Sequence, residues 1–236
     1  MGNTFVLSKS NNKFNKSKIM KIAVLGTGMV GATISSKLIE LGHSVKMGSR
    51  TATNEKAIEW TNNNGENASN GTYAEAAAFG EILFNCTSGT GALEALNLAG
   101  EQNLAGKIII DVANPLDFSK GMPPTLSISN GNSLGEEIQK AFPNAKVVKA
   151  LNTMWCGLMV NPAMINGGDH NVFVSGNYAE AKGIVKEILV SFGWLQQNIM
   201  DLGDITTARG TEMYLPLWLQ IYGATNSGAF NIKIVS

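Results

Sequence analysis

A run of closely spaced glycines between an apolar segment and a helical pattern constrains the fold of this chain more than any other feature. Gly26-Thr27-Gly28-Met29-Val30-Gly31 has the spacing GxGxxG. It overlaps the end of the apolar run 21–26, which is typical of a strand buried on both faces. Apolar residues then recur at helical spacing from Met29 to Leu41, and Gly42 can end that helix with a left-handed cap. A strand, a glycine turn and a helix in this order predict a dinucleotide-binding βαβ unit.

The three glycines of this turn have different physical roles. Gly26 permits a tight turn, Gly28 leaves room for a pyrophosphate against the backbone, and Gly31 lets the helix pack closely on the sheet. The turn and the positive end of the helix would hold the phosphates through backbone N–H groups, so Thr27, Met29 and Val30 are also expected contacts. The alternative is a loop that merely turns the chain, and the flanking strand and helix favour dinucleotide binding.

The rest of the chain continues this alternation. A second strand is predicted at 43–49 and the start of a second helix at 54–60. Further apolar runs follow at 81–87, 107–114, 145–152 and 171–176, with helical stretches at 91–100, 133–142 and 179–192. Such alternation predicts an α/β fold with a Rossmann-type doubly wound parallel sheet.

Two later segments carry expectations of their own. Ser133 and Glu136 have the spacing of a capping box. Residues 117–132 before them are rich in Gly, Pro and Ser and too long for an ordinary connection, which predicts a loop that covers a site. Residues 205–222 predict a helix, and hence a small C-terminal helical unit.

Composition argues against several classes of partner. Lys+Arg and Asp+Glu number 18 each and no basic cluster occurs, so a nucleic-acid partner is not expected. The two cysteines, Cys86 and Cys156, and the two histidines have no metal-ligand spacing, so we expect no disulfide framework, no metal site and a reducing cytoplasm. No apolar run reaches the about 20 residues that span a bilayer, so a membrane partner is not expected.

The end of the second strand distinguishes NAD from NADP. A protein that prefers NAD usually presents an acidic residue there to the ribose 2′-OH. This chain instead reads Met47-Gly48-Ser49-Arg50-Thr51. The fork of an arginine can donate two charge-assisted hydrogen bonds to a 2′-phosphate. Ser49 and Arg50 therefore predict NADP(H) as the cofactor, and the alternative is that Arg50 is an ordinary solvated surface residue.

From Met20 onward, nearly the whole chain resembles the family of NADPH-dependent coenzyme F420 reductases and their bacterial relatives. The resemblance rests on KIAVLGTGMVG, the GSR at 48–50, NPLDF, NGNSLGEEIQKAFPNAKVVKALNT, VFVSGN, PLWL and FNIKIV. It implies that Thr27, Ser49, Arg50 and a following lysine, here Lys56, contact the NADP phosphates. Lys56 lies farther from the GSR than the family lysine usually does, and a solvated helix face explains it equally well.

Resemblance and geometry agree that the carboxyl ends of the parallel strands line the cofactor crevice. Near the nicotinamide half they nominate Cys86, Thr87, Ser88, Ala113, Asn114, Leu151, Asn152 and Thr153. Each of these could equally be a capping or turn residue. Covalent catalysis by Cys86 is rejected, because a cysteine at a buried strand end is usually a small hydrophobe and no histidine lies near it in sequence.

The predicted organisation has three parts: a polar N-terminal extension (1–19), an NADP-binding Rossmann domain (20–194) and a small C-terminal unit (195–236). The aromatic residues of the C-terminal unit, Trp218 and Tyr222, are explained equally by a wall for a second substrate and by a homodimer interface.

The resemblance implies an oxidoreductase that moves a hydride between the nicotinamide and a second electron carrier, F420-like or flavin-like, with no protein acid or base. Segment 87–96 lacks the Pro-Trp pair associated with F420-using members, so a flavin, a quinone or another small-molecule acceptor stays open. The alternatives are an NADPH-dependent reductase of small carbonyls or imines and a non-enzymatic NADP sensor.

The residues after the second strand generate a prediction about cofactor preference. NADPH should bind at least about tenfold more tightly than NADH, a difference of about 1.4 kcal/mol. Arg50→Ala should weaken NADPH far more than NADH, because only NADPH has a 2′-phosphate to lose. Titration calorimetry with both dinucleotides measures the two affinities. A uniform loss would show that Arg50 has a structural role instead.

Overall fold

The computed structural model describes residues 19–235. Its core is an eight-stranded sheet with the order β10-β9-β8-β5-β4-β1-β2-β3. The strands are β1 (Lys21–Leu25), β2 (Ser44–Ser49), β3 (Ala68–Thr72), β4 (Ile82–Asn85), β5 (Ile108–Asp111), β8 (Lys146–Ala150), β9 (Val172–Ser175) and β10 (Ile199–Gly203). The strands from β3 to β8 are parallel and in the 3-2-1-4-5-6 order of doubly wound dinucleotide-binding folds. The predicted fold class is confirmed.

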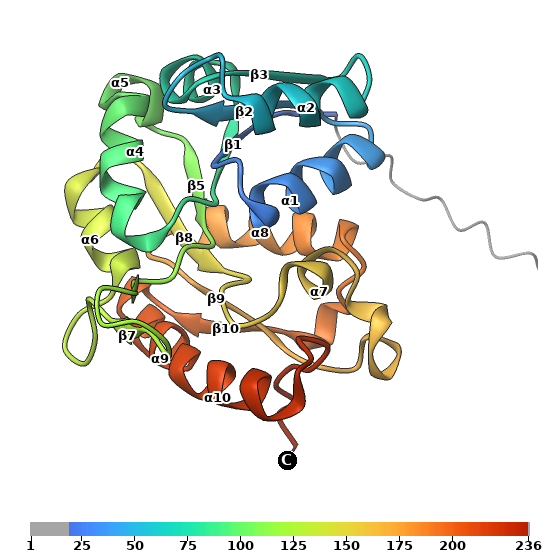
Figure 1. Cartoon of the computed structure of the whole chain (residues 1–236), viewed down its shortest axis with the longest axis vertical. Helices are drawn as coiled ribbons and strands as arrows, with labels where there is room; N and C mark the ends of the chain where they lie inside the picture. The colour runs from blue at the N-terminus through green and yellow to red at the C-terminus, as the bar shows by residue number, and fades with distance from the viewer. Residues whose placement is uncertain (1–18, 236) are drawn as a thin grey trace, which may run out of the picture.

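Helices cover both faces of this sheet (Figure 1). One face carries α1 (Met29–Glu40), α2 (Glu55–Asn63), α7 (Cys156–Val160) and α8 (Ala179–Ser191). The opposite face carries α3 (Tyr73–Phe79), α4 (Ala92–Ala99), α5 (Glu101–Leu104), α6 (Leu134–Ala141) and α9 (Ala208–Met213). Burial on both faces explains why the central strands read as continuous apolar runs instead of alternating ones.

Strand β1 shows this double burial residue by residue. Ile22 and Val24 join the core under α1 and α8, whereas Ala23 and Leu25 join the core under α3 and α4. All four side chains are fully buried. The helix that follows ends as the sequence predicts, because Gly42 adopts a φ of +88° and donates to the carbonyl oxygen of Ile39.

Two strands of the eight-stranded sheet were not predicted from periodicity. β3 has the sequence ASNGT, whose polar side chains and glycine give no apolar pattern, and it forms one edge of the sheet. β10 forms the other edge and pairs parallel to β9, and these two run antiparallel to β8. Because β10 belongs to the same sheet, the sheet continues past residue 194, where the sequence-based division placed the end of the Rossmann domain. That division stays a prediction, and its part before residue 19 lies outside the described residues.

Three local expectations are corrected. The segment 205–222 is not one helix: a short 3₁₀ turn at Ile205–Thr207 precedes α9, and a separate helix, α10 (Leu215–Thr225), follows it. The break falls beside Pro216, because proline has no N–H to continue the hydrogen bonds of the preceding helix. The capping box of α6 is only half formed: Ser133 Oγ accepts from the N–H of Glu136, but the N–H of Ser133 donates to Asn132. The loop 117–132 is also partly ordered, because a short hairpin pairs β6 (Leu116–Asp117) with β7 (Thr125–Leu126).

None of the helices formed between residues 19 and 235 combines the length and the apolar character needed to cross a bilayer.

Candidate functional site

The glycine turn after β1 brings three parts of the backbone into close contact. Gly26 has a φ of +116°, and a Cβ placed there would lie 2.5 Å from the carbonyl oxygen of Cys86 after β4. A Cβ on Gly31 would lie 2.1 Å from the carbonyl oxygen of Gly26. Only glycine fits at these two positions, and their close approach sets α1 directly against β1 and β4.

Gly28 differs from its two neighbours in the motif. A Cβ on Gly28 would meet no atom within 4 Å, and its φ of −77° suits any residue. It is the N-cap of α1 and provides no side-chain hydrogen bond to the helix. The first turn of α1, which contains Met29, Val30 and Gly31, therefore presents its N–H groups without a side-chain cap, as an anion site at a helix start requires.

The predicted residues of the first, second and fourth strand ends come together around one hollow of about 190 Å³. Its lining residues are Gly26, Thr27, Gly28, Arg50, Tyr73, Cys86, Thr87, Ser88 and Gly91. Sequence reasoning did not find Tyr73, because the polar strand β3 that precedes it has no apolar periodicity. Ser49 is buried at the end of β2 and its hydroxyl donates to the carbonyl oxygen of Thr51 at 2.6 Å.

The predicted residues after β5 and β8 meet each other one step farther along the sheet. Asn114 Nδ2 donates to the carbonyl oxygen of Asn152 at 2.9 Å, and Asn152 Nδ2 donates to Asn114 Oδ1 at 3.0 Å. Leu151, the residue before Asn152, is buried and has a φ of +65°, which a leucine rarely adopts. Such strain is found at functional sites, where the surrounding structure holds it in place. Thr153 is buried beside this pair.

Lys56 is not among the residues that line the hollow. It lies exposed in the first turn of α2, after the N-cap Asn54, whose side chain accepts from the N–H of Ala57. Its predicted contact with a phosphate stays a prediction.

Cys86 lies in the wall of the hollow, and its environment keeps the thiol protonated. Burial, together with the charge of Asp111, raises the pKa of the Cys86 thiol. The thiolate is the nucleophilic form of cysteine, so a raised pKa makes this side chain a poor nucleophile at neutral pH. This agrees with the rejection of covalent catalysis.

A fully buried charge cluster lies behind the ends of β5 and β8. Lys149 Nζ is 2.5 Å from Asp111 Oδ2 and 2.8 Å from Glu212 Oε1, and it donates to the carbonyl oxygen of Ala113 at 2.8 Å. Glu212, from α9, also accepts from the N–H groups of Leu134 and Gly135 at the start of α6. Burial opposes the charge of Lys149, but Asp111 and Glu212 outweigh it and raise the pKa of Lys149 above its ordinary value.

Hydrogen bonds connect this cluster to the hollow. Asp111 Oδ1 accepts from Asn85 Nδ2 at 2.8 Å, and Asn85 Oδ1 accepts from the hydroxyl of Thr87 at 2.7 Å. A continuous chain of polar contacts thus runs from Glu212, through Lys149 and Asp111, to Thr87. Because Asp111, Lys149 and Glu212 lie at separate strand and helix positions with no motif spacing, the sequence carried no signal for the cluster.

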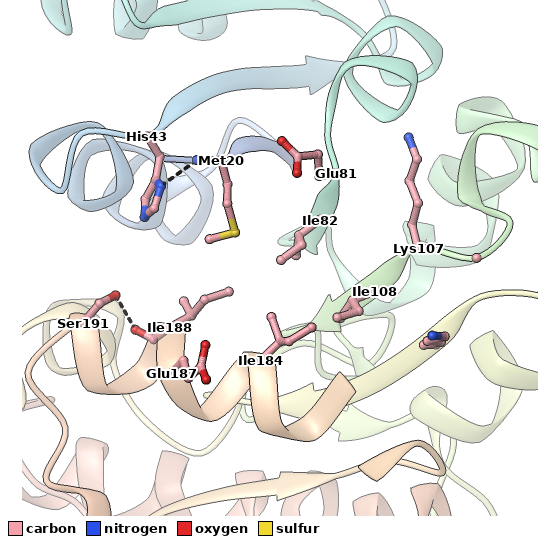
Figure 2. Close-up of a pocket in the computed structure, with 12 residues that line it drawn as sticks. Met20, His43, Glu81, Ile82, Lys107, Ile108, Ile184, Glu187, Ile188 and Ser191 are labelled. Carbon is pink, nitrogen blue, oxygen red and sulfur yellow. Dashed lines mark hydrogen bonds between the residues drawn. The ribbon is translucent and has the colours of Figure 1, made fainter. Parts of the chain in front are cut away.

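Another hollow, of about 430 Å³, lies at the opposite ends of the central strands (Figure 2). There the amino ends of β1, β4, β5 and β8 face α8, and Figure 2 shows Ile184 and Ile188 pointing from that helix towards Ile82 and Ile108. Ligands of doubly wound folds bind at the carboxyl ends of the strands. The groove in Figure 2 is therefore not the expected dinucleotide site.

The fold and the crevice together define a class of protein. Three features are those of a Rossmann-type protein suited to NADP(H). They are the strand order, the glycine turn with open space at Gly28, and an arginine in place of an acidic residue after β2.

Comparison with known proteins narrows this class to a family. A family model described as NADP oxidoreductase, coenzyme F420-dependent, matches residues 21–115. A solved structure from Arthrobacter sp. FB24, provisionally assigned as an F420-dependent NADP-reductase, is 51% identical, and the match covers 92% of this chain and 100% of that one with a TM-score of 0.87. The chain belongs to the family of coenzyme F420-dependent NADP oxidoreductases.

More distant proteins share part of this similarity. Metalloreductase STEAP3 of Rattus norvegicus is 27% identical over 205 residues, which are 84% of this chain and 38% of the rat protein. The chain thus spans about two fifths of the length of that curated relative. A reductive aminase of Aspergillus terreus, in complex with NADPH and ethyl levulinate, is 18% identical with a TM-score of 0.61, over 89% of this chain and 63% of the aminase. At that identity the likeness concerns the fold alone.

Gly28 and Gly31 form a matched pair for testing the crevice. Gly28→Ala should change the free energy of unfolding by less than about 0.5 kcal/mol, because its methyl meets open space, yet weaken NADPH at least about tenfold. Gly31→Ala should destabilise the fold by about 1–3 kcal/mol, because its methyl meets the Gly26 carbonyl. Urea unfolding and calorimetric titration give the two readouts. Unchanged NADPH affinity in a folded Gly28→Ala variant would contradict the placement of the pyrophosphate.

The buried cluster predicts a large loss of stability when its cation is removed. Lys149→Met leaves Asp111 and Glu212 without their counter-charge and should lower the free energy of unfolding by about 3–5 kcal/mol, measured by urea unfolding. Lys37→Met is the matched control, since Lys37 pairs with Glu40 of α1, whose side chain is exposed and can be solvated without its partner, and it should cost less than about 1 kcal/mol. Equal effects of the two substitutions would contradict the structural role of the cluster.

The raised pKa of Lys149 also gives a pH dependence with a definite sign. A lysine whose pKa is higher in the folded than in the unfolded chain contributes its stability fully below the ordinary lysine value of 10.5. That contribution is lost as the pH rises through the folded value. On the alkaline side, the difference in unfolding free energy between the natural chain and Lys149→Met should therefore persist past pH 10.5 and shrink only as the pH rises further.

Proposed function

We propose that this protein transfers a hydride between the nicotinamide of NADP(H) and the ring of a second electron carrier, F420-like or flavin-like. The observation that supports this most strongly is the convergence of the ends of β1, β2 and β4 on one crevice that has a phosphate turn and an arginine after β2. Asn114 and Asn152, which are hydrogen-bonded to each other, lie at the ends of the neighbouring strands β5 and β8. Family membership and the NADPH in the structurally similar aminase support the choice of cofactor.

Different groups of residues would bind the pyrophosphate, the 2′-phosphate and the nicotinamide half of the dinucleotide. The turn 26–31 and the start of α1 would hold the pyrophosphate through backbone N–H groups. Ser49 and Arg50 would bind the 2′-phosphate at the end of β2, with Thr27, and Lys56 from α2, as further phosphate contacts. The residues after β4, β5 and β8 would orient the nicotinamide half. These are Cys86, Thr87, Ser88, Ala113, Asn114 and Asn152.

Bound NADPH supplies a hydride at C4 of its nicotinamide. The contribution of this chain would be proximity, orientation and exclusion of water. The ionised groups nearest to the ends of β5 and β8, Asp111 and Lys149, are buried and paired with each other and with Glu212, and the thiol of Cys86 has a raised pKa. None of them is poised to exchange a proton with a bound molecule, which favours direct hydride transfer over acid–base chemistry.

The second carrier would lie against the loop 118–132 and the C-terminal helices. Trp218 of α10 stacks on Tyr222 and on Phe230, and Gly228 contacts Trp155, which follows Asn152 and Thr153. The exposed residues Leu217 and Tyr222 would either complete this wall or contact a second copy of the chain. Sedimentation or light scattering of the natural chain and of Leu217→Lys separates these two roles, since only a dimer contact would change the mass.

The state of the two cysteines supports a location in a reducing compartment. Cys86 and Cys156, both within the described part of the chain, are free. We therefore propose that the protein works in the cytoplasm.

Acceptor identity and mechanism are tested together. The protein, NADPH and a panel of F420, FMN, FAD, quinones and a ferric chelate are mixed while absorbance at the NADPH band is followed. F420 or a flavin should be reduced, and NADPH deuterated at C4 should give a primary isotope effect or place the label on an acceptor carbon. Truncation of Cys86, Thr87, Ser88, Asn152 or Thr153, one at a time, should lower turnover less than the about 100-fold typical of a lost acid or base.

Two results would contradict this function. A loss beyond about a thousandfold in one truncated variant, with folding and NADPH affinity intact, would favour protein-assisted reduction of a carbonyl or imine. Tight NADPH binding with no turnover of any member of the panel would favour an NADP sensor.

A further inference from the structure

The guanidinium of Arg50 is already engaged by a carboxylate across the mouth of the crevice. Arg50 Nε lies 3.3 Å from Glu94 Oε1, and Arg50 Nη2 lies 3.4 Å from Glu94 Oε2, so both atoms of the fork face one carboxylate. Arg50 follows β2, whereas Glu94 lies in the first turn of α4. The pair therefore spans two walls of the hollow, from the β2 side to the α4 side, with Tyr73 and Gly91 in its lining.

This ion pair is exposed, which distinguishes it from the buried cluster around Lys149. The side chains of Arg50 and Glu94 are 67% and 59% exposed. Exposed ion pairs contribute little to stability and exchange readily with other partners. The pair is thus not needed to hold the fold together, and its arginine stays accessible to an anion from solution.

A 2′-phosphate and the Glu94 carboxylate would use the same edge of Arg50. The Nε and Nη2 donors form the edge with which arginine binds phosphates in a bidentate manner. The negatively charged phosphate would therefore have to displace Glu94 from this edge of Arg50, which costs free energy. The corresponding ribose of NAD(H) carries an uncharged 2′-OH, which does not require Arg50 to leave Glu94. Glu94 would therefore act on NADP(H) and not on NAD(H).

We propose that Glu94 is a specificity-determining residue of the dinucleotide site, which holds Arg50 in the empty protein and competes with the 2′-phosphate for it. Glu94 keeps the affinity for NADP(H) below what Arg50 alone would provide. This inference rests on the proposed use of NADP(H), and it adds a residue from α4 that acts through Arg50.

Calorimetric titration of NADPH and NADH against Glu94→Gln tests the proposal. Glutamine keeps the size and the polarity of the side chain but removes its charge. At low ionic strength NADPH should bind about fivefold more tightly, as expected from the loss of an exposed ion pair, while NADH affinity stays unchanged. The gain should decrease as salt is added, because the interaction is between exposed charges.

Glu101→Gln is the matched control. Glu101 is likewise an exposed acid in the first turn of a helix, α5, so its replacement makes the same change in net charge and in the charge at a helix start. It should leave the ratio of NADPH to NADH affinity unchanged. The same rise in NADPH affinity in both variants would mean that general electrostatics, and not competition for Arg50, is responsible, and would overturn the proposal.

A double-mutant cycle with Arg50→Ala locates the effect. In the Arg50→Ala background, Glu94→Gln should no longer change the affinity for NADPH by more than about twofold, because no guanidinium remains to be released. An equal change for NADPH and NADH in Glu94→Gln, or weaker NADPH binding, would overturn the inference alone. Failure of the natural chain to bind either dinucleotide would instead overturn the proposed function and the inference with it.

Discussion

The contact between Gly26 and Gly31 is the constraint on which the arrangement of the crevice depends. A carbonyl oxygen that would lie 2.1 Å from a Cβ leaves no room for any side chain, so helix α1 approaches strand β1 as closely as two backbones allow. Gly26 also lies directly against the carbonyl oxygen of Cys86, so the loops after β1 and β4 together form one wall of the crevice. Gly28, between these two contacts, faces open space of the kind a pyrophosphate needs.

One buried cluster of charges and one exposed ion pair near this crevice show how burial decides the role of a charged side chain. Lys149, Asp111 and Glu212 are almost completely buried, and removal of one charge leaves the others uncompensated, so the cluster acts as part of the fold. It joins α9 and α6 to the strand ends and reaches Thr87 through Asn85. Arg50 and Glu94 are exposed, so their interaction is weak and exchangeable, which suits a residue that binds a charged ligand.

Much of the fold and part of the candidate site were predictable, for identifiable reasons. The central strands are buried on both faces and therefore read as short apolar runs, from which β1, β4, β5 and β8 were predicted. Polar edge strand β3 has no such signal, so Tyr73, which follows it, was missed. The break at Pro216 was missed because apolar residues recur at helical spacing on both sides of it. The roles of all the predicted site residues, Lys56 and the residues after β5 and β8 among them, stay predictions.

The sequence by itself determined the class of fold and the place where a dinucleotide would bind. Local features are enough for this, because a strand, a glycine turn and a helix are adjacent along the chain and carry their geometry in consecutive residues. Tertiary structure alone decided which distant side chains meet there. Glu94 lies 44 residues after Arg50, and Glu212 lies 63 residues after Lys149 and 101 after Asp111, yet each reaches its partner. Such contacts depend on the order of strands in the sheet and on how helices pack over it, and no short stretch of sequence encodes that order.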